Sequence, residues 1–141
     1  MSKIICFLLL IFCTIASKAQ NPENWTSKQL VEPSTLARAI QSGKNVPLIF
    51  SVGPGAPIPH SVAIGIVKDQ ENLDKLKKEL STIPRNKHIV IYCGCCPFEH
   101  CPNIRPAIAV LKNMKFTHYQ LLNLPHNIKA DWIDQGYPVE K

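Results

Sequence analysis

Apolar runs of strand length recur along the chain and alternate with segments of helical periodicity. The runs are continuous rather than alternating, which is typical of strands that are buried on both faces, as in a parallel sheet. The runs at Pro47–Val52 and His88–Cys93 are more continuously apolar than the other two. The predicted strands are Pro47–Val52, Ser61–Val67, His88–Cys93 and Tyr119–Leu124.

The segments around these runs predict helices. Leu73, Leu76 and Leu80 share one face of a helix whose other faces are charged. Proline in a first turn and glycine just past a last turn, such as Gly43, mark helix ends. Asn103 is a candidate N-cap. The predicted helices are Pro33–Gln41, Glu71–Leu80, Ile104–Met114 and Asn127–Gln135.

This alternation predicts an α/β fold: a single small domain with a mainly parallel central sheet and helices on both faces. The chain has 141 residues, which suits one domain with one core after an apolar leader is set aside. In such sheets, ligands bind at the carboxyl ends of the strands. The segment between the strand His88–Cys93 and the helix Ile104–Met114 therefore lies where an α/β domain places its chemistry.

Residues 1–19 have the pattern of a signal peptide. Lys3 provides a positive start, Ile4–Ile15 is almost wholly apolar, and Ser17 and Ala19 are small residues at the usual cleavage spacing. The apolar stretch is short for a bilayer span, and an uncleaved membrane anchor is the alternative. We expect cleavage after Ala19, no membrane association afterwards, and an extracytoplasmic location, either periplasmic or secreted.

The formal net charge of +6 comes from lysines and arginines that are scattered along the chain. A nucleic-acid-binding surface typically has a dense block of basic residues interleaved with aromatic ones. The lysines and arginines of this chain form no such block. The sequence therefore does not favour a nucleic-acid partner.

Four of the six cysteines lie in CGCCPFEHC, residues 93–101. The other two, Cys6 and Cys13, belong to the leader. Disulfides in small secreted domains normally close long loops, whereas every bridge within 93–101 would close a very short one. The cluster therefore indicates a functional site rather than a disulfide scaffold.

The place of this stretch before a predicted helix favours thiolate chemistry. Unpaired backbone N–H groups and the helix dipole at a helix N-terminus stabilise a thiolate and lower its pKa. The same groups bind anions such as thiosulfate or a persulfide. Arg105, in the first turn of the predicted helix, adds a positive charge and is the candidate anion-binding side chain.

Five segments, taken in order, match the pattern of one protein family. They are VPLIFSV, HSVAIG, HIVIYC with the loop after it, NIRPAIAVLKNMKFTHYQLLNL, and the ending DWIDQGYPVEK. Over residues 30–141 this order resembles the rhodanese-like family of sulfurtransferases. The resemblance implies a rhodanese-like domain over 30–141, a thiosulfate-type sulfurtransferase activity without a cofactor, and an active cysteine at Cys93.

The family chemistry implies that the Cys93 thiolate attacks a small sulfur donor and holds the sulfur as a persulfide. A thiol or another thiophilic acceptor then receives it. This loop departs from the family pattern, because eleven residues separate Cys93 from Arg105 and three of them are cysteines. Cys96 and Cys101 are therefore alternative nucleophiles. Residues 51–53 read Ser-Val-Gly where family members carry an aspartate and an arginine, so the usual partner of Arg105 is missing.

Cys95, Cys96 and Cys101 are the candidate resolving or relay thiols. A thiol close to a persulfide can take over its sulfur, or form a disulfide and release reduced sulfur. In an oxidising compartment the same pairs can rest as disulfides, which would require a redox partner protein.

Two alternatives from other classes remain open. A soft-metal site for Cu(I) or Zn is the first, because several thiolates, with His100 as a minor candidate, suit such ions; the spacing lacks the C-x2-C pairs of structural zinc sites. A catalytically silent binding module is the second, because fold does not fix function. The candidate ligands of the soft-metal site are Cys93, Cys95, Cys96 and Cys101. A phosphatase is not favoured, because no cysteine precedes Arg105 at the spacing of a phosphatase loop.

Overall fold

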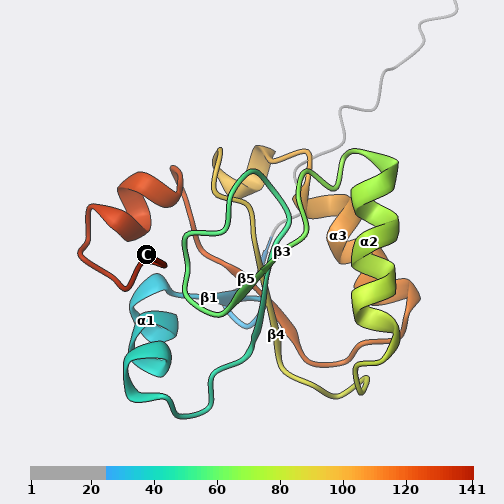
Figure 1. Cartoon of the computed structure of the whole chain (residues 1–141), viewed down its shortest axis with the longest axis horizontal. Helices are drawn as coiled ribbons and strands as arrows, with labels where there is room; N and C mark the ends of the chain where they lie inside the picture. Colours follow the sequence, from blue (N-terminus) through green and yellow to red (C-terminus); the bar gives the residue numbers. More distant parts are fainter. Residues whose placement is uncertain (1–24) are drawn as a thin grey trace, which may run out of the picture.

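The computed structural model describes residues 25–141, which form one five-stranded, all-parallel sheet (Figure 1). The expected signal peptide, residues 1–19, lies outside the described residues. Among residues 25–141, no helix has the length and apolarity needed to cross a membrane. In spatial order the strands are β1 (Leu30–Val31), β5 (Tyr119–Leu122), β4 (Ile89–Tyr92), β2 (Leu48–Ser51) and β3 (Ser61–Ala63).

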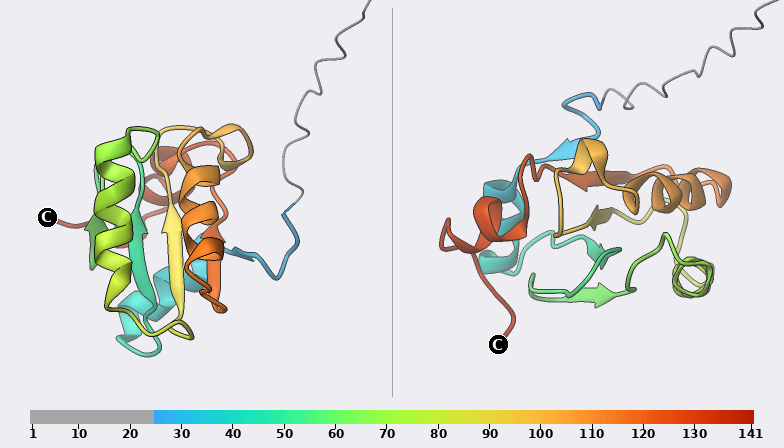
Figure 2. Two further views of the ribbon diagram at one scale, coloured as in Figure 1. Left: turned by 90° about the vertical axis from the view of Figure 1, so that its right-hand side faces the viewer. Right: turned by 90° about the horizontal axis from the view of Figure 1, so that it is seen from above.

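Helical segments cover both faces of the sheet, as the alternation of elements predicts. Figure 1 shows α1 and the π-helical turn η2 on one side and α2 and α3 on the other. Figure 2 shows α2 and α3 side by side along the sheet. The bounds are α1 (Pro33–Ser42), α2 (Gln70–Ser81), α3 (Ile104–Asn113) and η2 (Lys129–Ile133).

The central strand β4 supplies side chains to two separate cores. All of its residues are buried, as a continuous apolar run predicts. Ile89 and Ile91 pack in the core beneath α2 and α3, whereas Val90 and Tyr92 pack in the core with Trp132 of η2. Because successive strand side chains point to opposite faces, Cys93 follows on the α2 and α3 side, where it packs with that core.

Helix ends follow the sequence signals closely. α1 begins with Pro33 in its first turn, and Gly43 ends it in the left-handed conformation, with φ of 66°. α2 buries Leu76 and Leu80 on one face. Each such side chain contributes roughly 1.5–3 kcal/mol of burial free energy.

The structure corrects two local expectations and adds two short elements. β3 ends at Ala63 rather than Val67, because the chain turns at Gly65, whose φ of 101° does not fit a strand. The expected last helix, 127–135, is the single π-helical turn η2. The edge strand β1 and the 3-10 turn η1 (Phe98–His100) carry too short a pattern to be predicted.

The strand order places a topological switch point between β2 and β4. From β2 the chain continues to β3 on one side, whereas from β4 it crosses through α3 to β5 on the other. Ligands of open α/β sheets bind outside the carboxyl ends of the strands at such a point. The loops that leave β2 and β4 there are residues 52–60 and 93–103.

Candidate functional site in the loop after β4

Cys93 lies at the carboxyl end of β4 and is only 2% exposed. The parallel pairing of β2 with β4 continues one step beyond the strands, because Val52 N donates to Tyr92 O at 2.9 Å. Gly53 therefore comes directly against the Cys93 side chain. A Cβ atom at position 53 would lie 2.3 Å from Cys93 Sγ, so only glycine leaves room for the sulfur.

The loop from Gly94 to Asn103 is tied to its surroundings by long-range hydrogen bonds. Gly94 O accepts from Ile128 N at 2.9 Å, and Phe98 N donates to Leu124 O at 3.2 Å. At the far end, Asn103 Oδ1 accepts from Lys68 N at 3.0 Å. These bonds fix the backbone that carries the four cysteines.

The four cysteines gather their sulfur atoms in one cluster, and no disulfide joins any of them. Their sulfur atoms lie within 4.8 Å of one another. Cys93 and Cys95 are 3.3 Å apart, and Cys95 and Cys96 are 3.2 Å apart, measured between Sγ atoms. Cys93 and Cys101 are buried, Cys96 is half-buried and Cys95 is exposed. The cluster therefore runs from the core to the surface.

Hydrogen-bond donors around Cys93 favour its ionised form. The Cys101 thiol donates to the Cys93 sulfur and lowers its pKa most, and burial opposes this by raising it. The Cys95 backbone N–H and the Asn103 side-chain amide, whose Nδ2 is 3.5 Å from Sγ, add to the lowering. The resulting pKa of Cys93 is about 5, well below that of an ordinary thiol.

The thiols around Cys93 shift in the opposite direction. Donation to Cys93 and burial both raise the pKa of Cys101. Partial burial of its sulfur raises the pKa of Cys95 most, and hydrogen bonds with Cys96 and Cys93 raise it further. Because a first negative charge disfavours a second one nearby, the cluster carries its charge on Cys93 near neutral pH.

Asn103 occupies the N-cap position of α3, as the sequence predicts, but its side chain has a different role. It precedes α3, but its side chain makes no capping hydrogen bond to that helix. The side chain is instead 3% exposed and bridges Lys68 N and Cys93 Sγ. Tertiary partners override the local capping preference here, and the sequence carries no signal for this contact or for the approach of Gly53.

Arg105 and His100 are exposed residues at the edge of the loop. The Arg105 guanidinium donates to the Glu99 carbonyl oxygen at 3.5 Å, so its side chain turns back over η1. The anion-binding role of Arg105 stays a prediction. Within residues 25–141, the group of side chains close enough to share a soft metal ion consists of the four cysteines and does not include His100.

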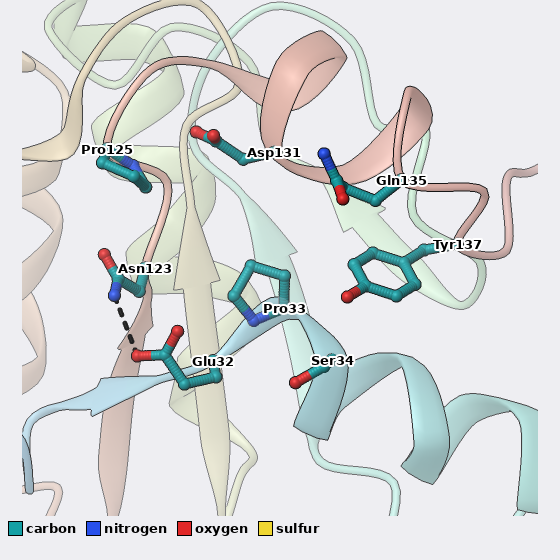
Figure 3. A pocket seen from close by; sticks show the side chains of 8 residues that line it. All are labelled: Glu32, Pro33, Ser34, Asn123, Pro125, Asp131, Gln135 and Tyr137. Atoms are coloured by element: carbon teal, nitrogen blue, oxygen red, sulfur yellow. Dashed lines mark hydrogen bonds between the residues drawn. The ribbon is translucent and has the colours of Figure 1, made fainter.

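A separate hollow of about 230 Å³ lies beyond the carboxyl ends of β1 and β5 (Figure 3). Two carboxylates in it already have partners: Glu32 accepts from Asn123 Nδ2 at 2.8 Å, and Asp131 Oδ1 lies 2.8 Å from His126 Nδ1. None of the four cysteines lines this hollow, so we place the candidate chemistry in the loop. The lining residues are Glu32, Pro33, Ser34, Asn123, Pro125, Asp131, Gln135 and Tyr137.

The fold has counterparts among solved structures, although no protein-family model and no curated protein sequence matches the chain. The Alr3790 protein from Anabaena sp. matches with a TM-score of 0.55 at 19% identity, over 78% of this chain and 90% of that one. A rhodanese-related protein from Thermoplasma volcanium matches with a TM-score of 0.51 at 18% identity, over 79% of this chain and 97% of that one. The fold expected from the order of motifs is thus confirmed, and the chain is a small α/β domain with the rhodanese-like fold.

Proposed function

We propose that this protein is a sulfurtransferase that carries a sulfane sulfur as a persulfide on Cys93. The observation that carries the proposal is the environment of the Cys93 sulfur, which is buried yet has hydrogen-bond donors from Cys95, Cys101 and Asn103 around it, and these lower its pKa. Ionisation of a buried thiol is unfavourable unless the site is built for it. An inert structural cysteine has no need of such donors.

The reaction follows from nucleophilic attack by this thiolate. With thiosulfate as the donor, the Cys93 thiolate attacks the outer sulfur atom. The sulfur–sulfur bond of thiosulfate breaks, and sulfite leaves with the electron pair. A thiol or cyanide then attacks the outer sulfur of the persulfide, and Cys93 leaves as a thiolate. The Asn103 amide and the Cys95 N–H stabilise the anion at both stages.

The position of the loop supports this assignment. Cys93 sits at the carboxyl end of the central strand, beside the switch point where α/β sheets bind ligands. The rhodanese-related structure from Thermoplasma volcanium supports the same fold. We propose a small sulfur donor and a thiol or other thiophilic acceptor as the partners.

Turnover of thiosulfate and cyanide to thiocyanate tests the proposal. We expect the Cys93→Ser variant to lose at least about a thousandfold in kcat/KM, as expected for loss of a nucleophile. Cys96→Ser is the matched control, because it removes an outer thiol of the same loop and should retain turnover. Activity that survives in Cys93→Ser and disappears in Cys96→Ser or Cys101→Ser would move the nucleophile. No turnover and no sulfur uptake by the wild type would leave a silent binding module.

The sulfur cluster also suits a soft metal ion, because four thiols within 4.8 Å can converge on Cu(I). Competition between the reduced protein and a Cu(I) chelator measures this binding. A tight one-to-one complex in a protein that takes up no sulfur from thiosulfate would favour a metal-binding domain. Sulfur uptake that proceeds in the presence of the chelator favours the transferase.

We also propose an extracytoplasmic location, from the leader-like pattern of residues 1–19. Expression of the full chain, followed by cell fractionation and an intact mass of the recovered protein, tests it. The expected mature chain begins at Gln20. An uncleaved chain that stays with the membrane fraction would contradict the proposal.

A further inference from the structure

The proposed function requires the sulfur to reach an acceptor, and the burial of Cys93 limits which acceptors can contact it. Only 2% of Cys93 is exposed. Small ions such as thiosulfate and cyanide need little room, whereas a peptide or protein thiol must bring its own backbone close to the sulfur it attacks. An exposed thiol beside Cys93 would remove this restriction.

The three neighbouring thiols differ in their ability to serve as that exit. Cys101 is 1% exposed and donates a hydrogen bond to Cys93, so it is more enclosed than the nucleophile itself. Cys96 contacts Cys95, at 3.2 Å, and is half-buried. Cys95 alone among these described cysteines is exposed, and its sulfur lies 3.3 Å from that of Cys93.

We propose that Cys95 is the relay thiol, which takes the sulfane sulfur from Cys93 and presents it to a bulky thiol acceptor. This inference rests on the proposed function and assigns its acceptor side. The exposed Cys95 side chain can turn outward to make room for the additional sulfur atom. Cys101 instead acts as a positioning residue that holds the Cys93 thiolate.

The transfer step balances without an oxidant or a reductant. The proton of the Cys95 thiol passes to the outer sulfur of the Cys93 persulfide, and the Cys95 sulfur then attacks that neutral outer sulfur and forms a new sulfur–sulfur bond. The bond between Cys93 Sγ and the outer sulfur breaks, and Cys93 keeps the electron pair as a thiolate. The proton of Cys95 stays with the sulfur that moves, which gives a Cys95 hydropersulfide. A stabilised thiolate is a good leaving group in such exchanges.

Attack on the inner sulfur would instead give a Cys93–Cys95 disulfide and release hydrosulfide. The loop disfavours that product, because Gly94 is the one residue between the two cysteines and its backbone is fixed. Gly94 O accepts from Ile128 N at 2.9 Å, and a Cβ at position 94 would lie 2.9 Å from the Ile128 side chain. A disulfide demands a specific torsion and spacing, which this anchored loop resists.

Discharge of the loaded protein to two acceptors of different size tests the relay. The purified protein is loaded with thiosulfate, freed of excess donor, and mixed with cyanide or with reduced glutathione, and the loss of sulfur is followed by intact mass. We expect the ratio of the glutathione rate to the cyanide rate to fall at least about tenfold in Cys95→Ser, because access governs the exchange. In Cys101→Ser both rates should change together, so that the ratio stays within about twofold.

The outcomes separate the relay from the proposed function. Loading that occurs in Cys95→Ser, with an unchanged rate ratio, would overturn the relay and leave the sulfurtransferase intact. A drop in the ratio in Cys96→Ser rather than Cys95→Ser would also overturn it. Release of sulfide with loss of two hydrogen atoms from the protein would show disulfide resolution instead of relay. A wild-type protein that never gains sulfur would overturn the proposed function itself.

Discussion

Replacement of Gly53 by alanine tests whether the Cys93 sulfur lies where the structure places it. The new methyl group would lie 2.3 Å from Cys93 Sγ, far inside an ordinary contact of 3.4–4 Å. Its next neighbour, the Cys93 Cβ at 3.4 Å, would be in normal contact. The conflict therefore involves a single atom, and removal of that atom should relieve it.

The expected magnitude has two parts of opposite sign. Overpacking in a well-ordered core costs about 1–3 kcal/mol in the free energy of unfolding. Gly53 does not adopt the left-handed conformation, so alanine is tolerated by the backbone and gains about 0.4–1 kcal/mol through reduced entropy of the unfolded chain. We expect Gly53→Ala to destabilise the protein by about 1–2 kcal/mol in net terms.

A double-mutant cycle isolates the contact. The wild type, Gly53→Ala, Cys93→Ala and the double variant are unfolded in urea under reducing conditions, and the free energy of unfolding is compared. In the Cys93→Ala background, Gly53→Ala should be neutral or stabilising by up to about 1 kcal/mol. The coupling energy between the two positions should therefore reach about 1–3 kcal/mol.

An equal cost of Gly53→Ala in both backgrounds would refute the reasoning, because it would show that the methyl group meets something other than the sulfur. The functional consequence gives a second reading of the same variant. A displaced sulfur loses its donors, so Gly53→Ala should raise the pKa of Cys93 toward that of an ordinary thiol.

Three further predictions concern the ionisation of Cys93, its contact with Asn103, and the binding of thiosulfate by Arg105. The ultraviolet absorbance of the thiolate in the wild type, minus that of Cys93→Ser, should titrate near pH 5. Since folding lowers this pKa, the free energy of unfolding that Cys93 contributes should be complete above about pH 9 and should decline as the pH falls toward 5. A titration above pH 8 would contradict both expectations. Asn103→Asp keeps an acceptor for Lys68 N but places a carboxylate beside the sulfur, so the pKa of Cys93 should rise and its alkylation rate at pH 6 should fall, about twofold for a rise of one unit and about tenfold for a rise of two; an unchanged rate would exclude the Asn103 contact. Arg105→Gln should raise the KM for thiosulfate about three- to tenfold with little change in kcat if the guanidinium attracts the anion, and unchanged kinetics would identify a surface arginine.

Most of the fold is predictable because its signals are local. The continuous apolar run at β4 and the leucine spacing of α2 each reflect burial that a strand or helix imposes on its own sequence. β1 escapes prediction because its two residues, Leu30–Val31, become a strand only by pairing with β5. β3 is shorter than its apolar run, because Gly65 turns the chain away from the sheet edge.

The candidate site is predictable as a location but not as a set of contacts. The cysteine cluster and its place after the central strand are visible in the sequence. The contact of Gly53 with Cys93 depends on the register of β2 against β4, which pairs Ser51 with Tyr92. The role of Asn103 depends on Lys68, 35 positions away. Such tertiary partners have no periodic signature, so the sequence predicts the position of Asn103 at the N-cap of α3 but not the contacts of its side chain.

The measurement that tests the central claim most directly is the intact mass of the reduced, metal-free protein before and after treatment with thiosulfate, followed by cyanide. Wild type and the Cys95→Ser, Cys96→Ser and Cys101→Ser variants should each gain the mass of one sulfur atom that cyanide removes, and Cys93→Ser should gain none. A wild-type protein that gains no sulfur, or a Cys93→Ser protein that gains cyanide-labile sulfur as readily as the wild type, would contradict the assignment of Cys93 as the sulfur carrier.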